Sequence, residues 1–432
     1  MTLTLLVKGG RLVNPACHQD EVCDVLIENG KIAAVGRDLA VAEGTEVLDA
    51  SGLVVAPGFI DMHVHLRQPG QSERETMASG TRAAAAGGIT RVATMPNTNP
   101  VIDKAILVDG LKYKAAREGV VKVEVVGSIS KNLEGVELSG MGGMAKSGVV
   151  AFSDDGRYVA NAAFMRKAME YASMFDKLVI DHCEEASLVE EGQMHEGVVS
   201  NELGLKGRPA VAEDIAVARD ILLAEATRTA VHIAHISTKN SVDMVRRAKA
   251  RGVRISAEAT PQHMILTDES LRSFNPAFKI NPPLRSDEHR QAVLEGLADG
   301  TIDAIVTDHA PHAAEDKDQE FNVSPSGFVG LETSVGAVLT FLYHAEQIDL
   351  STIIKDMSCA PARLLHLDAG VVAAGKAADL TILDLDKEWA VDAAAFYSKS
   401  KISPFDEMLF HGKAVATIVD GEIIMKDGVV LK

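Results

Sequence analysis

Pro57-Gly58-Phe59-Ile60-Asp61-Met62-His63-Val64-His65 contains the strongest indication of this chain's fold. Its short apolar run predicts a buried β-strand that ends in two histidines. Side chains two positions apart in a strand point to the same face, so His63 and His65 present two imidazoles side by side. Two neutral imidazoles at this spacing suit a divalent metal such as zinc.

Seven more short apolar runs follow, and helical stretches alternate with them. Stretches such as Asp214 to Ala226 and Ser241 to Ala250 carry apolar residues three and four positions apart, which predicts helices. Eight strands alternating with helices favour a closed, parallel, TIM-like (β/α)8 barrel, with a doubly wound open sheet as the alternative. The expected strands are 59–64, 89–95, 122–128, 148–153, 178–182, 230–236, 253–259 and 303–307.

The two ends of the chain have a different pattern, with short apolar segments broken by turn pairs. Asn29-Gly30 lies between two such segments and predicts a β-hairpin. Neither end has enough strands for a stable core, so we expect the ends to pair into one small β-sandwich domain. We therefore predict a composite β-domain over 1–56 and 368–432, with the barrel over 57–367.

Polar side chains stand where the expected barrel strands end, which is where barrels collect their chemistry. One strand-end histidine alone is more often hydrogen-bonded or exposed than a metal ligand. Several histidines and aspartates converging on one barrel mouth instead predict a metal site. The strand-end residues are His63, His65, Asn97, Asp154, Asp155, His182, His235 and Asp308.

Length, charge and cysteine content narrow the class of protein. A chain of 432 residues is long enough for a domain of ~250–300 residues and a smaller one. A formal charge of −18 argues against nucleic-acid or anionic-membrane partners. The four cysteines form no CxxC pair, no apolar run reaches the ~18 residues of a membrane span, and residues 1–10 are typical of a strand and turn rather than a signal peptide. We expect a cytoplasmic enzyme.

Five motifs resemble a known family. The opening strand is similar to that of the amidohydrolase superfamily, and the other four are similar to dihydroorotase, in its longer bacterial type. The resemblance spans nearly the whole chain, including the split β-domain. The motifs are Pro57 to His65, His65-Leu66-Arg67-Gln68-Pro69-Gly70, Met95-Pro96-Asn97-Thr98, Asn281-Pro282-Pro283-Leu284-Arg285 and Thr307-Asp308-His309-Ala310-Pro311-His312.

The resemblance implies a site for one or two zinc ions. Many superfamily members bridge two metals with a carboxylated lysine at the end of strand four, but Ser153-Asp154-Asp155 stands there in this chain. A carboxylate has two oxygens and could bridge two cations directly. Strand alternation does not choose between Asp154 and Asp155, and the family's spacing favours Asp155. The implied ligands are His63, His65, Asp155, His182, His235 and Asp308.

The implied reaction interconverts N-carbamoyl-L-aspartate and L-dihydroorotate in pyrimidine biosynthesis. Its hydrolytic direction needs a base that accepts a water proton and returns it to the leaving nitrogen, and Asp308 is our candidate. The ring carries a carboxylate, to which Arg67 could donate a fork of hydrogen bonds. The resemblance adds substrate contacts at Asn97, Asn281, His312, Ser326 and Gly327, the last two in a polar loop between Ala313 and Gly330. Such loops often cover the site.

Other histidines and acids have simpler interpretations. His232 is one of several histidines that we expect to fill the core or lie on the surface. Glu184 and Glu185 are most simply part of a solvated helix face.

Two other functions compete with this hypothesis. Another cyclic amidohydrolase, such as a hydantoinase or an allantoinase, would use the same metal chemistry and differ only in the residues on the substrate side. A catalytically silent scaffold for aspartate transcarbamoylase is expected to have lost metal-binding histidines, which this chain retains. We expect a homodimer, and an active enzyme could also associate with aspartate transcarbamoylase.

Overall fold

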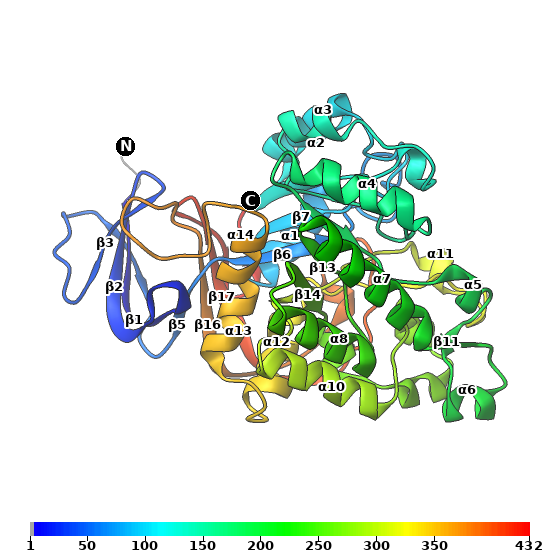
Figure 1. Cartoon of the computed structure of the whole chain (residues 1–432). Helices are drawn as coiled ribbons and strands as arrows, with labels where there is room; N and C mark the ends of the chain where they lie inside the picture. Colours follow the sequence, from blue (N-terminus) through cyan, green and yellow to red (C-terminus); the bar gives the residue numbers. More distant parts are fainter. Residues whose placement is uncertain (1–3) are drawn as a thin grey trace.

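The computed structural model of the chain, which describes residues 4–432, contains two large β-sheets of different kinds (Figure 1). The eight-stranded sheet is parallel throughout and is surrounded by helices. The nine-stranded sheet joins strands from both ends of the chain. A barrel with a small β-sandwich domain built from the termini is therefore confirmed as the fold class.

The eight strands of the parallel sheet follow the chain in order around the barrel. The first and last strands meet through a bridge between Val64 and His309, where the amide of His65 donates to the carbonyl of His309 at 2.8 Å. All eight expected strands are present, and several are shorter than expected at one end or both. The strands are β6 (Phe59–Val64), β7 (Ile89–Thr94), β8 (Lys122–Gly127), β9 (Ala151–Ser153), β10 (Leu178–Asp181), β13 (Val231–Ile233), β14 (Ile255–Ala259) and β15 (Ala304–Ile305).

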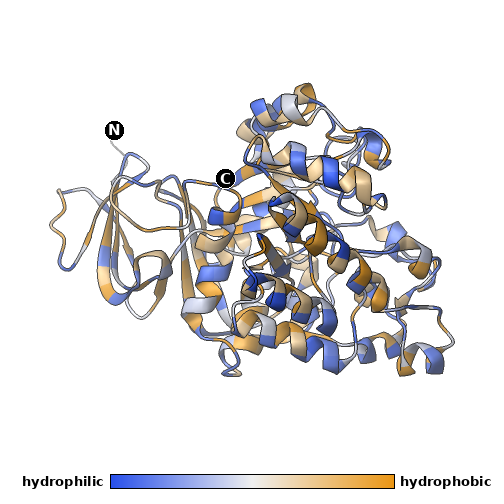
Figure 2. Ribbon diagram, viewed as in Figure 1, coloured by the Kyte–Doolittle hydropathy of each residue, from blue (hydrophilic) through white to orange (hydrophobic). Residues whose placement is uncertain are grey.

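Helices pack around the outside of this sheet and bury one apolar side each. In α8, Val242, Val245 and Ala248 are buried while its other side is polar, and the Thr238 side chain caps its first turn. Hydrophilic and hydrophobic residues accordingly alternate along the outer helices (Figure 2). The two helices predicted from apolar spacing are present as α7 and α8. The longer helices are α1 (Met77–Ala86), α2 (Ala105–Glu118), α4 (Ala162–Ser173), α7 (Val211–Thr227), α8 (Lys239–Ala250), α10 (Asp287–Ala298) and α13 (Leu350–Met357).

The nine-stranded sheet ties the two chain ends together. Strand β5 pairs in parallel with β1 and antiparallel with β16, so Val55 lies beside Leu12 on one side and Ile382 on the other. Asn29 and Gly30 both have positive φ, at 52° and 77°, as the predicted hairpin turn between β2 and β3 requires. The strands are β1 (Thr4–Asn14), β2 (Gln19–Glu28), β3 (Lys31–Gly36), β4 (Glu46–Asp49), β5 (Val54–Pro57), β16 (Leu380–Ala390), β17 (Leu409–Val419), β18 (Glu422–Lys426) and β19 (Val429–Val430).

The predicted domain limits, 1–56 with 368–432 and 57–367, stay a prediction. The expected strand and turn over 1–10 falls on β1 from Thr4 onward, and the three residues before it lie outside the described part of the chain. Within residues 4–432, no helix combines the length and apolar character that crossing a membrane requires.

Candidate metal centre

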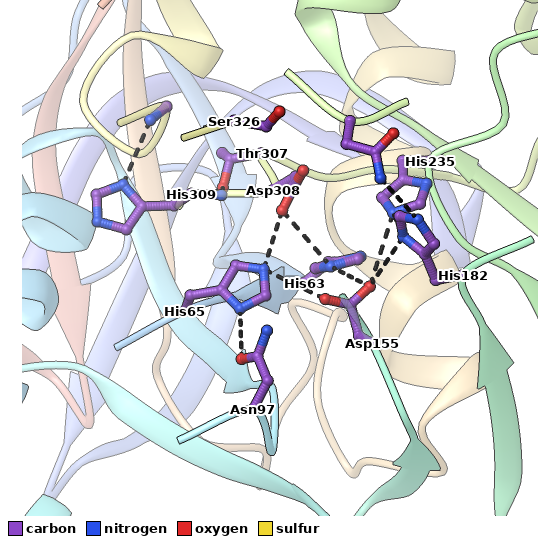
Figure 3. A network of polar contacts seen from close by, with 12 residues as sticks. His63, His65, Asn97, Asp155, His182, His235, Thr307, Asp308, His309 and Ser326 are labelled. Carbon is purple, nitrogen blue, oxygen red and sulfur yellow. Dashed lines mark hydrogen bonds and ion pairs between the residues drawn. The ribbon is translucent and has the colours of Figure 1, made fainter. Parts of the chain in front are cut away.

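Six polar side chains converge at the carboxyl ends of the barrel strands (Figure 3). They come from five segments, at the ends of β6, β9, β10, β13 and β15. Five of the side chains are at most 5% exposed and that of Asp308 is 15% exposed, so the group is closed off from bulk water. The six are the predicted ligands His63, His65, Asp155, His182, His235 and Asp308.

Asp155 lies at the centre of the group. Its Oδ1 is 3.4 Å from His63 Nε2 and 3.6 Å from both His182 Nδ1 and His235 Nε2. Its Oδ2 faces the other way and is 3.4 Å from His65 Nε2. Asp154 points away and accepts hydrogen bonds from the backbone amides of Ile129 and Ser130. Of the two aspartates that strand alternation left open, Asp155 is the one whose two oxygens face histidines on both sides.

These separations match what one shared ion would impose. Two ligand atoms held ~2.1 Å from a tetrahedral ion lie ~3.4 Å apart. The contacts of Asp155 lie close to that value, as does the 3.6 Å between His63 Nε2 and Asp308 Oδ1. Two groups of three residues each bring three ligand atoms within 4.8 Å of one another. One group is His63, Asp155 and His235, and the other is His63, His65 and Asp308. Both groups therefore offer the donors and the spacing that a bound metal ion takes.

Charge and hydrogen bonding in the cluster point the same way. Buried side-chain atoms normally have hydrogen-bond partners, yet His63 Nε2 and Asp155 Oδ1 have none among the described residues. Burial would raise the pKa of Asp155, but the imidazoles of His63, His182 and His235 hold it well below its ordinary value. Burial would lower the pKa of His63, and the carboxylates of Asp155 and Glu258 raise it well above normal instead. The Asp155 carboxylate is thus anionic, and the carboxylates around His63 favour positive charge at its ring. Both features suit a bound cation.

The backbone is strained at the same strand ends. Arg67, His235 and Asp308 have positive φ angles of 59°, 30° and 49°. Non-glycine residues in this region cost about 1–3 kcal/mol each and cluster at functional sites. These backbone conformations are therefore higher in energy than the alternatives, and the surrounding fold must stabilise them. They place the three side chains at the mouth of the barrel.

A cleft of about 250 Å³ opens from the cluster, and Arg67 lines it. The guanidinium is buried, its Nε donates to the carbonyl of Pro311 at 3.0 Å, and no carboxylate of residues 4–432 lies within salt-bridge distance of it. Burial, and next the charge of Arg74, lower the pKa of Arg67 to about 10, so it stays positive at neutral pH. A buried cation without a protein counter-ion in a cleft is typical of an anion-binding site.

The other predicted substrate residues also line this cleft, where several contact one another. Asn97 accepts a hydrogen bond from His65 Nδ1 at 2.9 Å, and the amide of Asn281 lies 3.1 Å from His182 Nε2. His312 Nε2 lies 2.7 Å from the carbonyl of Ser326, and burial together with Arg67 lowers its pKa to about 3, so its ring is neutral. Gly327 has φ +123° and no room for a Cβ beside Ala310, which restricts this position to glycine. Their contacts with a substrate stay predictions.

The structure adds residues that sequence reasoning missed. Glu258 on β14 accepts a hydrogen bond from His63 Nδ1 at 2.5 Å. The sequence feature that could have indicated its role is a charged residue inside a mostly apolar, buried strand. Arg208 also lines the cleft, where its Nη1 donates to Asn281 at 2.6 Å and to Glu184 at 3.0 Å. The interpretation of Glu184 as part of a solvated helix face is wrong, because this glutamate precedes α5 (Ala186–Val189) and pairs with Arg208 at the site.

Fold and cluster together define a class, the metal-dependent barrel hydrolases of the amidohydrolase type. The chain is similar to an L-hydantoinase (dihydropyrimidinase) from Arthrobacter aurescens, with a TM-score of 0.90 and 27% identity over 99% of this chain and 97% of that one. A dihydropyrimidinase from Brevibacillus agri shares the fold, with a TM-score of 0.87 and 22% identity over 99% of this chain and 96% of that one.

Sequence similarity narrows the class to one family. The family described as "Dihydro-orotase-like" matches residues 52–241. A dihydroorotase from Citrifermentans bemidjiense is 50% identical over 98% of this chain and 99% of its own length. One from Pelotomaculum thermopropionicum is 51% identical over 99% of this chain and 100% of its own. The chain belongs to the dihydroorotase family, whose members are hydrolases of cyclic amides.

The loop over 313–330 that carries Ser326 and Gly327 is anchored by a buried lysine. Lys317, at the end of the short helix α11 (Ala314–Lys317), donates to the carbonyls of Pro276 and Pro325, each at 2.8 Å. Burial and the neighbouring ammonium of Lys279 lower the pKa of Lys317 to about 7. The segment that we expected to be a polar loop is therefore held in place by a buried lysine, whose protonated form is destabilised by its surroundings.

We predict that Lys317→Met flattens the pH dependence of stability above pH 7. Between pH 7 and 10 the unfolded chain holds a proton on Lys317 that the folded chain has released, so the free energy of unfolding of the wild type rises with pH relative to the variant. One proton corresponds to a slope of about 1.4 kcal/mol per pH unit. Denaturant unfolding at pH 7, 8 and 9 measures the difference, and parallel curves for the two proteins would contradict it.

Proposed function

We propose that this chain is a zinc-dependent dihydroorotase that interconverts N-carbamoyl-L-aspartate and L-dihydroorotate, with loss or gain of water, in pyrimidine biosynthesis. The observation that carries the proposal is the position of Arg67. This buried cation lacks a carboxylate partner in the described chain and lines the same cleft as Asp155 and Asp308. A cyclic amide that bears a carboxylate would supply both the missing anion and the bond to be cleaved.

The chain's own donors would hold two zinc ions. His63, His65 and Asp308 would hold one, His182 and His235 the other, and Asp155 would bridge them. Histidine nitrogens and carboxylate oxygens form the donor set that zinc prefers in hydrolases. Zinc, when bound, supplies a Lewis acid that polarises the ring carbonyl and lowers the pKa of water.

Asp308 is the proposed proton shuttle. Its Oδ1 lies 3.0 Å from His65 Nε2, and its backbone is held in a strained conformation that aims the carboxylate into the cleft. Burial would raise the pKa of Asp308, but His65 and His63 lower it, so the carboxylate is anionic and can accept a proton from water at neutral pH. Returning that proton to the ring nitrogen completes cleavage of the amide.

The substrate would be oriented by its carboxylate. Arg67 would pair with this group through its terminal nitrogens, since its Nε is used by Pro311. The amide group of Asn97 and the segment of Ser326 and Gly327 border the same cleft and would contact the ring. The neutral ring of His312 can bind the ligand without adding charge.

A hydantoinase-like activity is the second candidate, because the similar solved structures include hydantoinases. Hydantoin lacks a ring carboxylate and would leave Arg67 unpaired, which favours dihydroorotate. Turnover of hydantoin or allantoin but not of dihydroorotate would overturn this choice. A silent scaffold is disfavoured because the complete set of six candidate ligands is retained and gathered.

The homodimer, the association with aspartate transcarbamoylase and the cytoplasmic location stay predictions. Light scattering tests the first, with a mass near one 45.9 kDa chain as the contrary result. Mixing with aspartate transcarbamoylase at micromolar concentration tests the second, and separate elution of the two proteins would count against it.

We predict that Asp308→Asn retains zinc but lowers kcat by about 10²–10⁴-fold, the usual contribution of a general base. The amide keeps the shape of the side chain and loses its ability to accept a proton. Metal analysis and a dihydroorotate assay measure both effects, with the exposed Asp109→Asn as the matched control. Unimpaired turnover in a zinc-loaded Asp308→Asn would remove Asp308 from the shuttle role.

We predict that Arg67→Gln lowers kcat/KM for dihydroorotate by roughly 10–100-fold, mainly through KM. Hydrogen bonds to a charged group are worth about 1.5–3 kcal/mol, and each 1.4 kcal/mol is tenfold. Arg82→Gln, at an exposed arginine, is the control and should stay within about twofold of the wild type. An unchanged KM in the Arg67 variant would contradict the assignment of Arg67 to the carboxylate.

A further inference from the structure

A chain of buried hydrogen bonds runs through the barrel interior to the metal centre. Ser256 Oγ lies 2.7 Å from His232 Nδ1, and His232 Nε2 lies 3.0 Å from Glu258 Oε2. The other oxygen of Glu258, Oε1, lies 2.5 Å from His63 Nδ1. His63, His232 and Glu258 are all 0% exposed, so water does not compete for these contacts.

The chemistry of these groups fixes where the protons are. Ionised Glu258 only accepts hydrogen bonds, so both imidazole nitrogens that face it must carry a proton. His232 then has its proton on Nε2, and its Nδ1 accepts from the hydroxyl of Ser256. His63 has a proton on Nδ1, so the neutral form of its ring has the lone pair on Nε2, which faces Asp155 at 3.4 Å and Asp308 at 3.6 Å.

Glu258 also touches a second arm of the cluster. Its Oε1 accepts a longer hydrogen bond, at 3.4 Å, from the backbone amide of His235, whose side chain faces Asp155. One carboxylate on β14 therefore contacts residues at the ends of β6 and β13. Neither oxygen of Glu258 pairs with a lysine or arginine of the described chain. Its side-chain partners within salt-bridge distance there are His63 and His232.

We propose that Glu258 is a positioning residue for the metal centre. It holds His63 in the tautomer and orientation that direct Nε2 at the ion, and His232 with Ser256 holds Glu258 in turn. This inference rests on the proposed binding of zinc. Residues that orient a metal-binding histidine typically affect metal affinity by about 10–100-fold when they are replaced.

A purely structural role is the alternative, because replacing any buried carboxylate disturbs a barrel. Glu75 provides a matched comparison. It is also 0% exposed and accepts from a histidine, His309 Nε2, at 3.3 Å. His309 points away from the cluster (Figure 3), and its other nitrogen faces the amide of Gly330. Glu75→Gln therefore makes the same chemical change without touching a candidate ligand.

The test is zinc affinity, measured on metal-free protein by competition with a chromophoric chelator. We expect Glu258→Gln to raise the Kd of at least one bound zinc ion by about 10–100-fold. Circular dichroism should show that the variant is folded. Glu75→Gln should stay within about threefold of the wild type, even if its melting temperature falls. Equal losses in the two variants, or an unchanged Kd in Glu258→Gln, would overturn the inference.

Two further results keep this test independent of the proposed function and of folding. If the wild type binds no zinc, the proposed function itself is contradicted. If the wild type binds zinc and the Kd of Glu258→Gln is unchanged, only the positioning role is contradicted. Nitrogen-15 NMR of selectively labelled histidines in the metal-free wild type reads the tautomer directly. We expect Nδ1 of His63 to carry a proton, and an Nδ1 without a proton would overturn the inference even if the variant failed to fold.

Discussion

Three carboxylates set the electrostatics of the barrel mouth: Asp155 and Glu258 are buried, and Asp308 is partly buried. Among the described residues their only ionisable partners within salt-bridge distance are histidines. Burying an unpaired carboxylate costs several kcal/mol, so positive charge has to be supplied within the barrel mouth. If the imidazoles act as neutral ligands, they do not supply it, and a bound cation must. With neutral imidazoles, the cluster is therefore electrostatically complete only when it holds a cation.

The barrel is well suited to meeting this constraint. Parallel strands bring their carboxyl ends to one mouth, so residues from His63 to Asp308 can face one point although they are far apart in sequence. The fold then holds costly local conformations, such as the left-handed backbone of His235 and Asp308. The terminal sheet joins the barrel next to its first strand, because β5 pairs with β16 immediately before β6 begins. The strand that carries His63 is therefore anchored at its amino end.

Much of this arrangement could be predicted from the sequence, because strand length, spacing and strand-end chemistry are local signals. The eight strands, the hairpin at Asn29-Gly30 and the gathering of strand-end histidines and aspartates follow from such signals, whereas the choice of Asp155 over Asp154 came from the family resemblance. The contacts of Glu258 and Arg208 do not follow from local signals. That of Glu258 depends on closure of the barrel, which places β14 two strands from β6. Those of Arg208 depend on how the two-stranded sheet of β11 (Met194–His195) and β12 (Gly207–Arg208) packs beside the cleft. The burial of Lys317 was missed for the same reason: its neighbours are 41 and eight positions away.

Anomalous X-ray diffraction from crystals of the zinc-loaded protein, recorded on both sides of the zinc absorption edge, would locate the ions directly. We expect two anomalous peaks at the barrel mouth, one on each side of the Asp155 carboxylate and each next to two histidines. Absence of any peak beside Asp155, or zinc found only at surface residues away from His63 and His182, would contradict this expectation.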